Sequence, residues 1–237
     1  MKSDFTPEEL TYKNYLKETQ ADAVSNILED EKGIEEIIHV VENTSWFAGE
    51  MRDKIIDPDS PKVACKEKCH WCCHQSVGVT APEVFRITKF IDENISAKEK
   101  QKLTNNLEKL DGMSRGKTTS QRAKLDMPCA FLNYGKCQIY EARPLACRRQ
   151  TSYDIDACKK AKPKGFPFGS IVSEKAQLVA FTGSIQGMVK GLNNMLPTHE
   201  INELDLTASV LETLKDESMP DKWLNGQTCF SECKLNT

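Results

Sequence analysis

Four cysteines fall within nine residues of this chain, in the segment Cys65-Lys-Glu-Lys-Cys69-His-Trp-Cys72-Cys73. A thiolate is a soft donor, and thiolates two or three residues apart can converge on one cation, as in zinc sites and iron–sulfur clusters. The adjacent residues Cys72 and Cys73 differ from the rest, because consecutive side chains point in divergent directions. One of the two is therefore expected to serve a second metal, or to have a structural or redox role.

Three further cysteines follow downstream, at Cys129, Cys137 and Cys147. Together with the first four, they favour a site assembled from two segments over a four-thiolate site built wholly from residues 65–73. We therefore predict a bipartite thiolate site that joins residues 65–73 to residues 129–147.

The composition is that of a globular protein, with 39% hydrophobic and 28% charged residues in a chain of 237. The net charge of −3, with basic and acidic residues interspersed, indicates no surface for nucleic acid or anionic lipid. No segment resembles a signal peptide or is apolar enough to span a bilayer. The predicted partner is thus a metal ion, with no nucleic acid and no membrane, and the expected location is the cytoplasm. Thiols stay reduced there, so metal ligation explains ten cysteines better than disulfides do.

Capping boxes predict the starts of three helices, each with a Ser or Thr followed three residues later by Glu. They are Thr6-Pro-Glu-Glu9, Thr80-Ala-Pro-Glu83 and Ser96-Ala-Lys-Glu99. Apolar residues at helical spacing follow each of them, and the same spacing predicts further helices over residues 34–41 and 178–196. Residues 111–125, polar and punctuated by glycine, read as a connection.

The helix over residues 178–196 also carries a stripe of small residues, which includes Gly183, Gly187 and Gly191. Because each glycine inside a helix costs up to about 1 kcal/mol, the stripe predicts the close approach of another backbone. This helix is expected to be central and packed on both sides. Upstream, two short apolar pieces around Asn133-Tyr-Gly-Lys136 predict a small β-hairpin.

The predicted fold is therefore mainly α, with a small irregular cysteine-rich metal-binding module that contains a short β-hairpin. We divide the chain into an N-terminal helical segment (1–60), the cysteine-cluster module with inserted helices (61–165) and a C-terminal helical segment (166–237). The three are expected to form one compact domain.

The cysteines and their neighbours occur in a recognisable order. They read Cys65-x3-Cys69-x2-Cys72-Cys73, Pro128-Cys129-x-Phe-Leu, Gly135-x-Cys137-x-Ile-Tyr140-Glu-x-Arg-Pro144 and Cys147-Arg148. This pattern resembles the YkgJ-type cysteine-cluster family, whose members carry a zinc- or iron-chelating domain, and the resemblance covers approximately residues 62–160.

The resemblance implies a centre of zinc or iron, the latter including an iron–sulfur cluster, held by the matched cysteines. The implied metal ligands are Cys65, Cys69, Cys72, Cys73, Cys129, Cys137 and Cys147, with Cys158 as an eighth. One branch of the family resembles flagellin lysine N-methylases, which use S-adenosylmethionine. No glycine-rich strand–turn–helix element supports that cofactor here, so we do not carry the activity over.

Other residues near the cluster allow two interpretations. His70 and His74 are either alternative ligands and donors to sulfur or solvated side chains. Arg143 and Arg148 either offset the charge of a metal–thiolate centre or form surface salt bridges. Cys229 and Cys233 are a peripheral pair or two thiols on one helical face, whereas Phe131 and Tyr140 are expected to pack against the site and exclude water.

Three functions fit these features. In the first, the protein binds a metal whose role is architectural or regulatory, because a site closed by thiolates leaves no position for water or substrate. The alternative is an iron–sulfur enzyme, either redox-active or resembling the methylase branch, with a polar pocket beside the metal. The third is a thiol redox sensor that uses Cys72 and Cys73, or Cys229 and Cys233.

Overall fold

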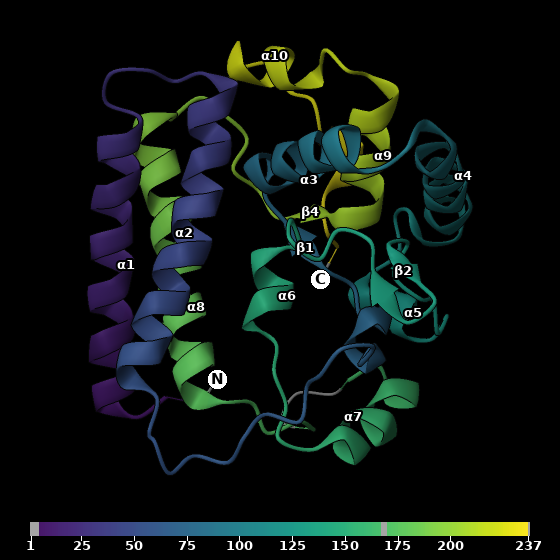
Figure 1. The fold of residues 1–237 in the computed structure, drawn as a ribbon. Coiled ribbons are helices and arrows are strands. Elements are labelled where there is room, and N and C mark those ends of the chain that lie inside the picture. The colour runs from purple at the N-terminus through teal and green to yellow at the C-terminus, as the bar shows by residue number, and fades with distance from the viewer. Residues whose placement is uncertain (1–4, 167–169, 237) are drawn as a thin grey trace.

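Three long helices lie side by side along one flank of the molecule (Figure 1). The computed structural model describes residues 5–166 and 170–236. The three helices are α1 (Pro7–Ile27), α2 (Ile34–Ile55) and α8 (Lys175–Met195). The predicted capping box starts α1, because Thr6 Oγ1 accepts from Glu9 N at 3.2 Å while Thr6 N donates to Glu9 Oε2 at 2.8 Å.

The small-residue stripe of α8 faces α1 at very short range. A Cβ atom on Gly183 would lie 2.6 Å from the carbonyl oxygen of Lys13, and one on Gly191 would lie 2.9 Å from that of Ala21. Only glycine lets the two backbones come this close. Helix α8 also packs against α2, so the predicted central helix with contacts on both sides is confirmed.

A second group of helices covers the other end of the chain's core. Its members are α3 (Ala81–Asn94), α4 (Ala97–Ser114), α9 (Leu206–Lys215) and α10 (Met219–Leu224). Helices α3 and α4 begin at the predicted caps Thr80 and Ser96, and both pack against α9. The strands β1 (Gly78–Val79) and β4 (Leu204–Asp205) pair antiparallel between these helices.

The cysteine-rich region is built from short elements. They are the 3-10 turn η1 (Trp71–His74), α5 (Thr119–Ala123), β2 (Leu132–Asn133), β3 (Lys136–Cys137), α6 (Leu145–Arg149), α7 (Ile155–Ala161) and the 3-10 turn η2 (Lys162–Lys164). The predicted hairpin is confirmed: Leu132 pairs with Cys137, and Tyr134 and Gly135 form its turn with φ values of 48° and 80°. Positive φ at both central residues is what a two-residue hairpin turn requires.

The connection predicted over residues 111–125 is wrong in part. Helix α4 continues through Ser114, and α5 starts at a capping box of Thr118 and Gln121. The box has Gln in place of Glu at its third helical position, and it supplies the same reciprocal hydrogen bonds.

The mainly α class is confirmed, because the strands within residues 5–166 and 170–236 form only two-stranded antiparallel pairs. Apolar side chains from all three predicted segments join one buried cluster, among them Val41, Phe131, Ile139 and Met188. No helix in the described ranges has the length and apolar character needed to cross a bilayer. A 3-10 turn, η3 (Ser231–Cys233), ends the described fold.

Candidate metal centre

The predicted ligands come from separate elements that gather around η1. Cys65 and Cys69 precede this turn, Cys72 and Cys73 lie in it, Cys129 precedes the hairpin, and β3, α6 and α7 carry Cys137, Cys147 and Cys158. All ten cysteines of the chain are unpaired. The structure therefore contains no disulfide framework among these residues.

A backbone hydrogen bond joins the two segments of the predicted bipartite site. Cys129 N donates to the carbonyl oxygen of Cys73 at 2.6 Å, and Leu132 N donates to the carbonyl oxygen of Cys129 at 3.0 Å. Because Leu132 also pairs with Cys137, the hairpin carries Cys129 and Cys137 together against η1. The arrangement brings residues distant in sequence to one place.

The position of Cys147 depends on a buried carboxylate in another helix. Leu145 N, at the start of α6, donates to Glu83 Oε1 at 2.9 Å, and Thr80 N donates to Glu83 Oε2 at 2.8 Å. Burial raises the pKa of Glu83, whose residue is only 5% exposed. Sequence reasoning found Glu83 as a cap of α3 but missed its second role at α6, because nothing local indicates that contact.

Cys65 and Cys158 meet at a third residue that sequence reasoning also missed. Ser152 is buried, its carbonyl oxygen accepts from Ala64 N at 2.8 Å, and it lies 4.0 Å from Cys65 Sγ. The thiol of Cys158 hydrogen bonds with the Ser152 side chain. This bond lowers the pKa of the thiol, but burial has the larger effect and raises it overall. The helix α7 that carries Cys158 packs against η1.

The thiols of this region are poor acids in the metal-free state. Burial raises the pKa of Cys129 to about 12 and raises that of Cys147 well above its usual value. A hydrogen bond with the Cys73 thiol, followed by burial, raises the pKa of Cys72. These thiols are therefore protonated at neutral pH, and a bound cation would displace their protons.

In the described part of the chain, no three His, Cys, Asp or Glu side chains converge tightly enough to hold a metal ion. Neutral thiols gain nothing from such convergence, whereas thiolates on a cation do. The described structure thus brings these thiols into one region without forming a complete ligand shell.

Two arginines beside the thiols lack carboxylate partners among the described residues. The Nε atoms of Arg143 and Arg148 are buried and make no hydrogen bond. Arg143 lowers the pKa of the Cys137 and Cys147 thiols, against the larger effect of burial. Of the two interpretations of these arginines, the salt bridge is not found. Paired cations without carboxylates fit the negative charge of a metal–thiolate centre.

Residues 64–164 match the model of a domain family described as "CxxCxxCC: Putative zinc- or iron-chelating domain". The match spans less than half of the chain, and we call the matched segment the CxxCxxCC domain. No curated protein and no solved structure matches the chain. The CxxCxxCC domain includes all eight predicted ligands, together with α3, α4 and Ser152, and leaves α1, α2 and α8 outside.

The other predicted residues of the CxxCxxCC domain differ in their surroundings. His70 is half-buried, its ring stacks on Trp71, and its Nδ1 lies 2.9 Å from the carbonyl oxygen of Lys68. His74 Nδ1 lies 3.2 Å from Asp126 Oδ1. Phe131 is buried as predicted, but the prediction for Tyr140 is wrong, since it is 54% exposed beneath Arg143.

The cysteines near the C-terminus make contacts elsewhere. Cys229 Sγ lies 3.4 Å from the carbonyl oxygen of Gln227 and 3.9 Å from that of Met219. Cys233 Sγ lies 4.0 Å from Nη1 of Arg115, at the end of α4. These contacts place neither thiol beside the other eight.

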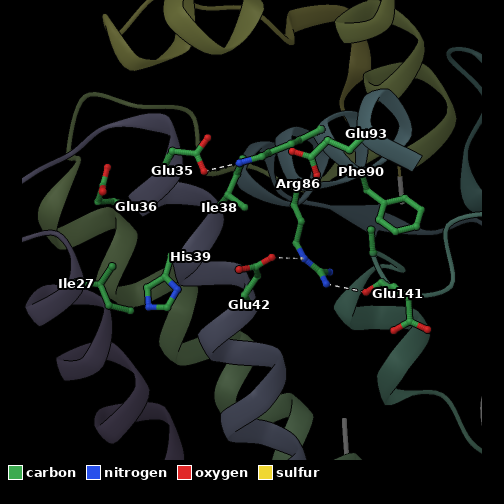
Figure 2. A pocket seen from close by; sticks show the side chains of 12 residues that line it. Ile27, Glu35, Glu36, Ile38, His39, Glu42, Arg86, Phe90, Glu93 and Glu141 are labelled. Atoms are coloured by element: carbon green, nitrogen blue, oxygen red, sulfur yellow. Dashed lines mark hydrogen bonds and ion pairs between the residues drawn. The ribbon is translucent and has the colours of Figure 1, made fainter. Parts of the chain in front are cut away.

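Two hollows adjoin the CxxCxxCC domain. One, lined by Cys129 and His74, has a volume of about 20 Å³. The other is a groove of about 800 Å³ between α2 and α3 whose lining contains no cysteine. Figure 2 shows Arg86 in this groove, with Nε 3.6 Å from Glu42 Oε1 and Nη2 donating to the Glu141 carbonyl oxygen at 2.6 Å. Arg148 Nη2 donates to the same oxygen at 2.6 Å, so the groove adjoins the arginines of the domain.

Proposed function

We propose that this protein holds zinc or iron in a bipartite thiolate site and that the centre is architectural or regulatory. The proposed ligands are Cys65, Cys69, Cys72, Cys73, Cys129, Cys137, Cys147 and Cys158. The observation that carries the proposal is the gathering of these thiols around η1, with Cys129 hydrogen-bonded to Cys73 through the backbone.

The local charge supports this assignment. A protonated thiol is neutral and needs no counter-charge, whereas four thiolates on one divalent ion carry a net charge of −2. Arg143 and Arg148 place two cations beside the thiols, and neither forms a salt bridge within the part of the chain that the structure describes. Arg148 donates to the Glu141 carbonyl oxygen and Arg143 lies over the Tyr140 ring, but neither contact neutralises the positive charge, so a negatively charged centre would stabilise this arrangement.

The size of the hollow beside Cys129 favours an architectural role over an enzymatic one. Its volume of about 20 Å³ is that of about one water molecule, and the larger groove of about 800 Å³ has no cysteine in its lining. When bound, the metal would supply cross-links between η1, the hairpin, α6 and α7, which are short elements with little core of their own.

We further propose that the helical segments and the module form one compact domain. Val41, Phe131 and Met188, one from each segment, belong to the same buried cluster. The free state of all ten cysteines supports a reducing compartment, for which the cytoplasm is our proposal.

Metal analysis tests the proposed function directly. Protein purified without oxygen should contain zinc or iron, and a brown sample with charge-transfer absorption would identify an iron–sulfur cluster. Cys69→Ser and Cys137→Ser should lower the metal content, while Cys229→Ser serves as the matched control and should not. A folded wild-type protein that contains no metal and takes up none would refute the proposal.

A further inference from the structure

Cys72 and Cys73 lie between two separate sets of thiols. Both belong to η1, and successive residues of a 3-10 turn are rotated by about 120°. In the metal-free state the Cys72 thiol nevertheless hydrogen bonds with that of Cys73. A bound metal would displace the proton between them, and because two neighbouring thiolates repel each other, each is then available to a different set of ligands. One mononuclear site does not accommodate two adjacent cysteines without strain. The placement therefore favours different sites for Cys72 and Cys73.

The first set, which we call the hairpin set, consists of Cys129, Cys137 and Cys147. Leu132 links the first two of these, because it pairs with Cys137 and its N–H donates to the Cys129 carbonyl oxygen at 3.0 Å. Each of the three thiols has Cys72 among its electrostatic neighbours. Arg143 lies beside Cys137 and Cys147 and supplies positive charge to this set.

The second set, which we call the Ser152 set, consists of Cys65, Cys69 and Cys158. Its thiols are electrostatic neighbours of one another and of Cys72. Ser152 holds the set together, since its carbonyl oxygen lies 4.0 Å from Cys65 Sγ and its side chain hydrogen bonds with the Cys158 thiol.

The two sets differ in exposure and charge. Cys65 is exposed to solvent, and the charged group beside Cys158 is the carboxylate of Asp154. The hairpin set has no exposed cysteine and lies beside an arginine. A negative carboxylate opposes the build-up of thiolate charge, and solvent access speeds the exchange of ligands.

A tetrahedral thiolate site takes four sulfur ligands. Eight thiols, in two sets of three and one adjacent pair, supply four to each of two sites. A single mononuclear site would leave the other four thiols without a role.

We propose that this chain holds two separate metal centres, one on the hairpin set and one on the Ser152 set, with Cys72 and Cys73 contributing one thiolate to each. The centre on the Ser152 set is the more labile of the two. The inference rests on the proposed function and extends it from a bipartite site to two non-equivalent sites.

Native mass spectrometry of the full chain tests the number of centres. Protein prepared without oxygen from zinc-supplemented medium should carry two zinc ions, and a chelator should remove one ion at least ten times faster than the other. Two ions that leave together would overturn the difference in lability. One ion per chain would overturn the inference, and no ion at all would instead refute the proposed function.

Serine variants test the assignment of each centre. Cys158→Ser should lose the fast-released ion and keep the slow one, whereas Cys147→Ser should lose the slow one and keep the fast one. Cys229→Ser is the control and should keep both. Cobalt(II) titration of the same proteins gives a second readout, since sulfur-to-cobalt charge-transfer absorption should fall by about half in each ligand variant. Loss of both ions in each single variant, with helical circular dichroism unchanged, would overturn the two-centre assignment.

Discussion

The buried carboxylate of Glu83, in the first turn of α3, accepts a hydrogen bond from Leu145 N at 2.9 Å. Leu145 is the first residue of α6, which begins after Pro144 without a side-chain cap of its own. Glu83 therefore satisfies backbone donors at the start of two helices, one of which carries Cys147. A residue of the helical core thus sets the position of a proposed ligand.

Removing this carboxylate should destabilise the protein and disturb the metal centre together. Glu83→Ala leaves Leu145 N and Thr80 N without acceptors in a buried place, which costs on the order of 1–3 kcal/mol each. We expect a lower free energy of unfolding in urea and faster loss of metal to a chelator. Glu99→Ala removes the carboxylate that accepts from Ser96 Oγ at the exposed cap of α4; it is the matched control and should lower stability without altering metal release.

The ionisation of Glu83 should appear in the pH dependence of stability. Burial raises its pKa above the usual value of a glutamate in the folded state. The stability that this shift contributes is present below the unfolded pKa and is lost as the pH rises through the folded pKa. As the pH rises above the usual glutamate pKa of about 4.3, the free energy of unfolding should therefore fall less in Glu83→Gln than in the wild type. Parallel curves for the two proteins would contradict the prediction.

Arg143 and Arg148 should strengthen metal binding through their charge. Replacing both with Met retains most of the side-chain volume but removes the cations beside the thiols. Changes of this kind near metal ligands lower affinity roughly 10- to 100-fold, and competition with a chromogenic chelator measures the effect. Arg149→Met alters an arginine of the same helix and should leave affinity unchanged.

The contact between α1 and α8 should not tolerate a methyl group. Gly183→Ala would place a Cβ 2.6 Å from the Lys13 carbonyl oxygen, so the helices must move apart at a cost of about 1–3 kcal/mol. Gly49→Ala, within α2, meets nothing within 4 Å and should stabilise the chain by up to about 1 kcal/mol. Thermal unfolding of the two variants should therefore shift in opposite directions.

Local signals account for the parts of the fold that were predicted. The caps at Thr6, Thr80 and Ser96 act over three residues, and the Tyr134-Gly135 turn acts over two, so short-range chemistry is sufficient to place these elements. The same logic failed for α5 only because Gln121 replaced the expected Glu in its capping box. The small-residue stripe of α8 indicated a close neighbour but did not identify α1 as that neighbour.

The sequence by itself determined the helical class, the hairpin and the identity of the candidate thiol ligands, because these depend on residue type and short spacing. Only the tertiary structure decided how the thiols are grouped. Ser152, which lies close to Cys158 in the sequence, contacts Cys65 far upstream, and the hairpin carries Cys129 to Cys73. Both long-range contacts join residues more than fifty positions apart. Such contacts follow from the burial of the whole chain, in which many weak apolar interactions outweigh any local preference. The spacing of the cysteines alone does not encode these contacts.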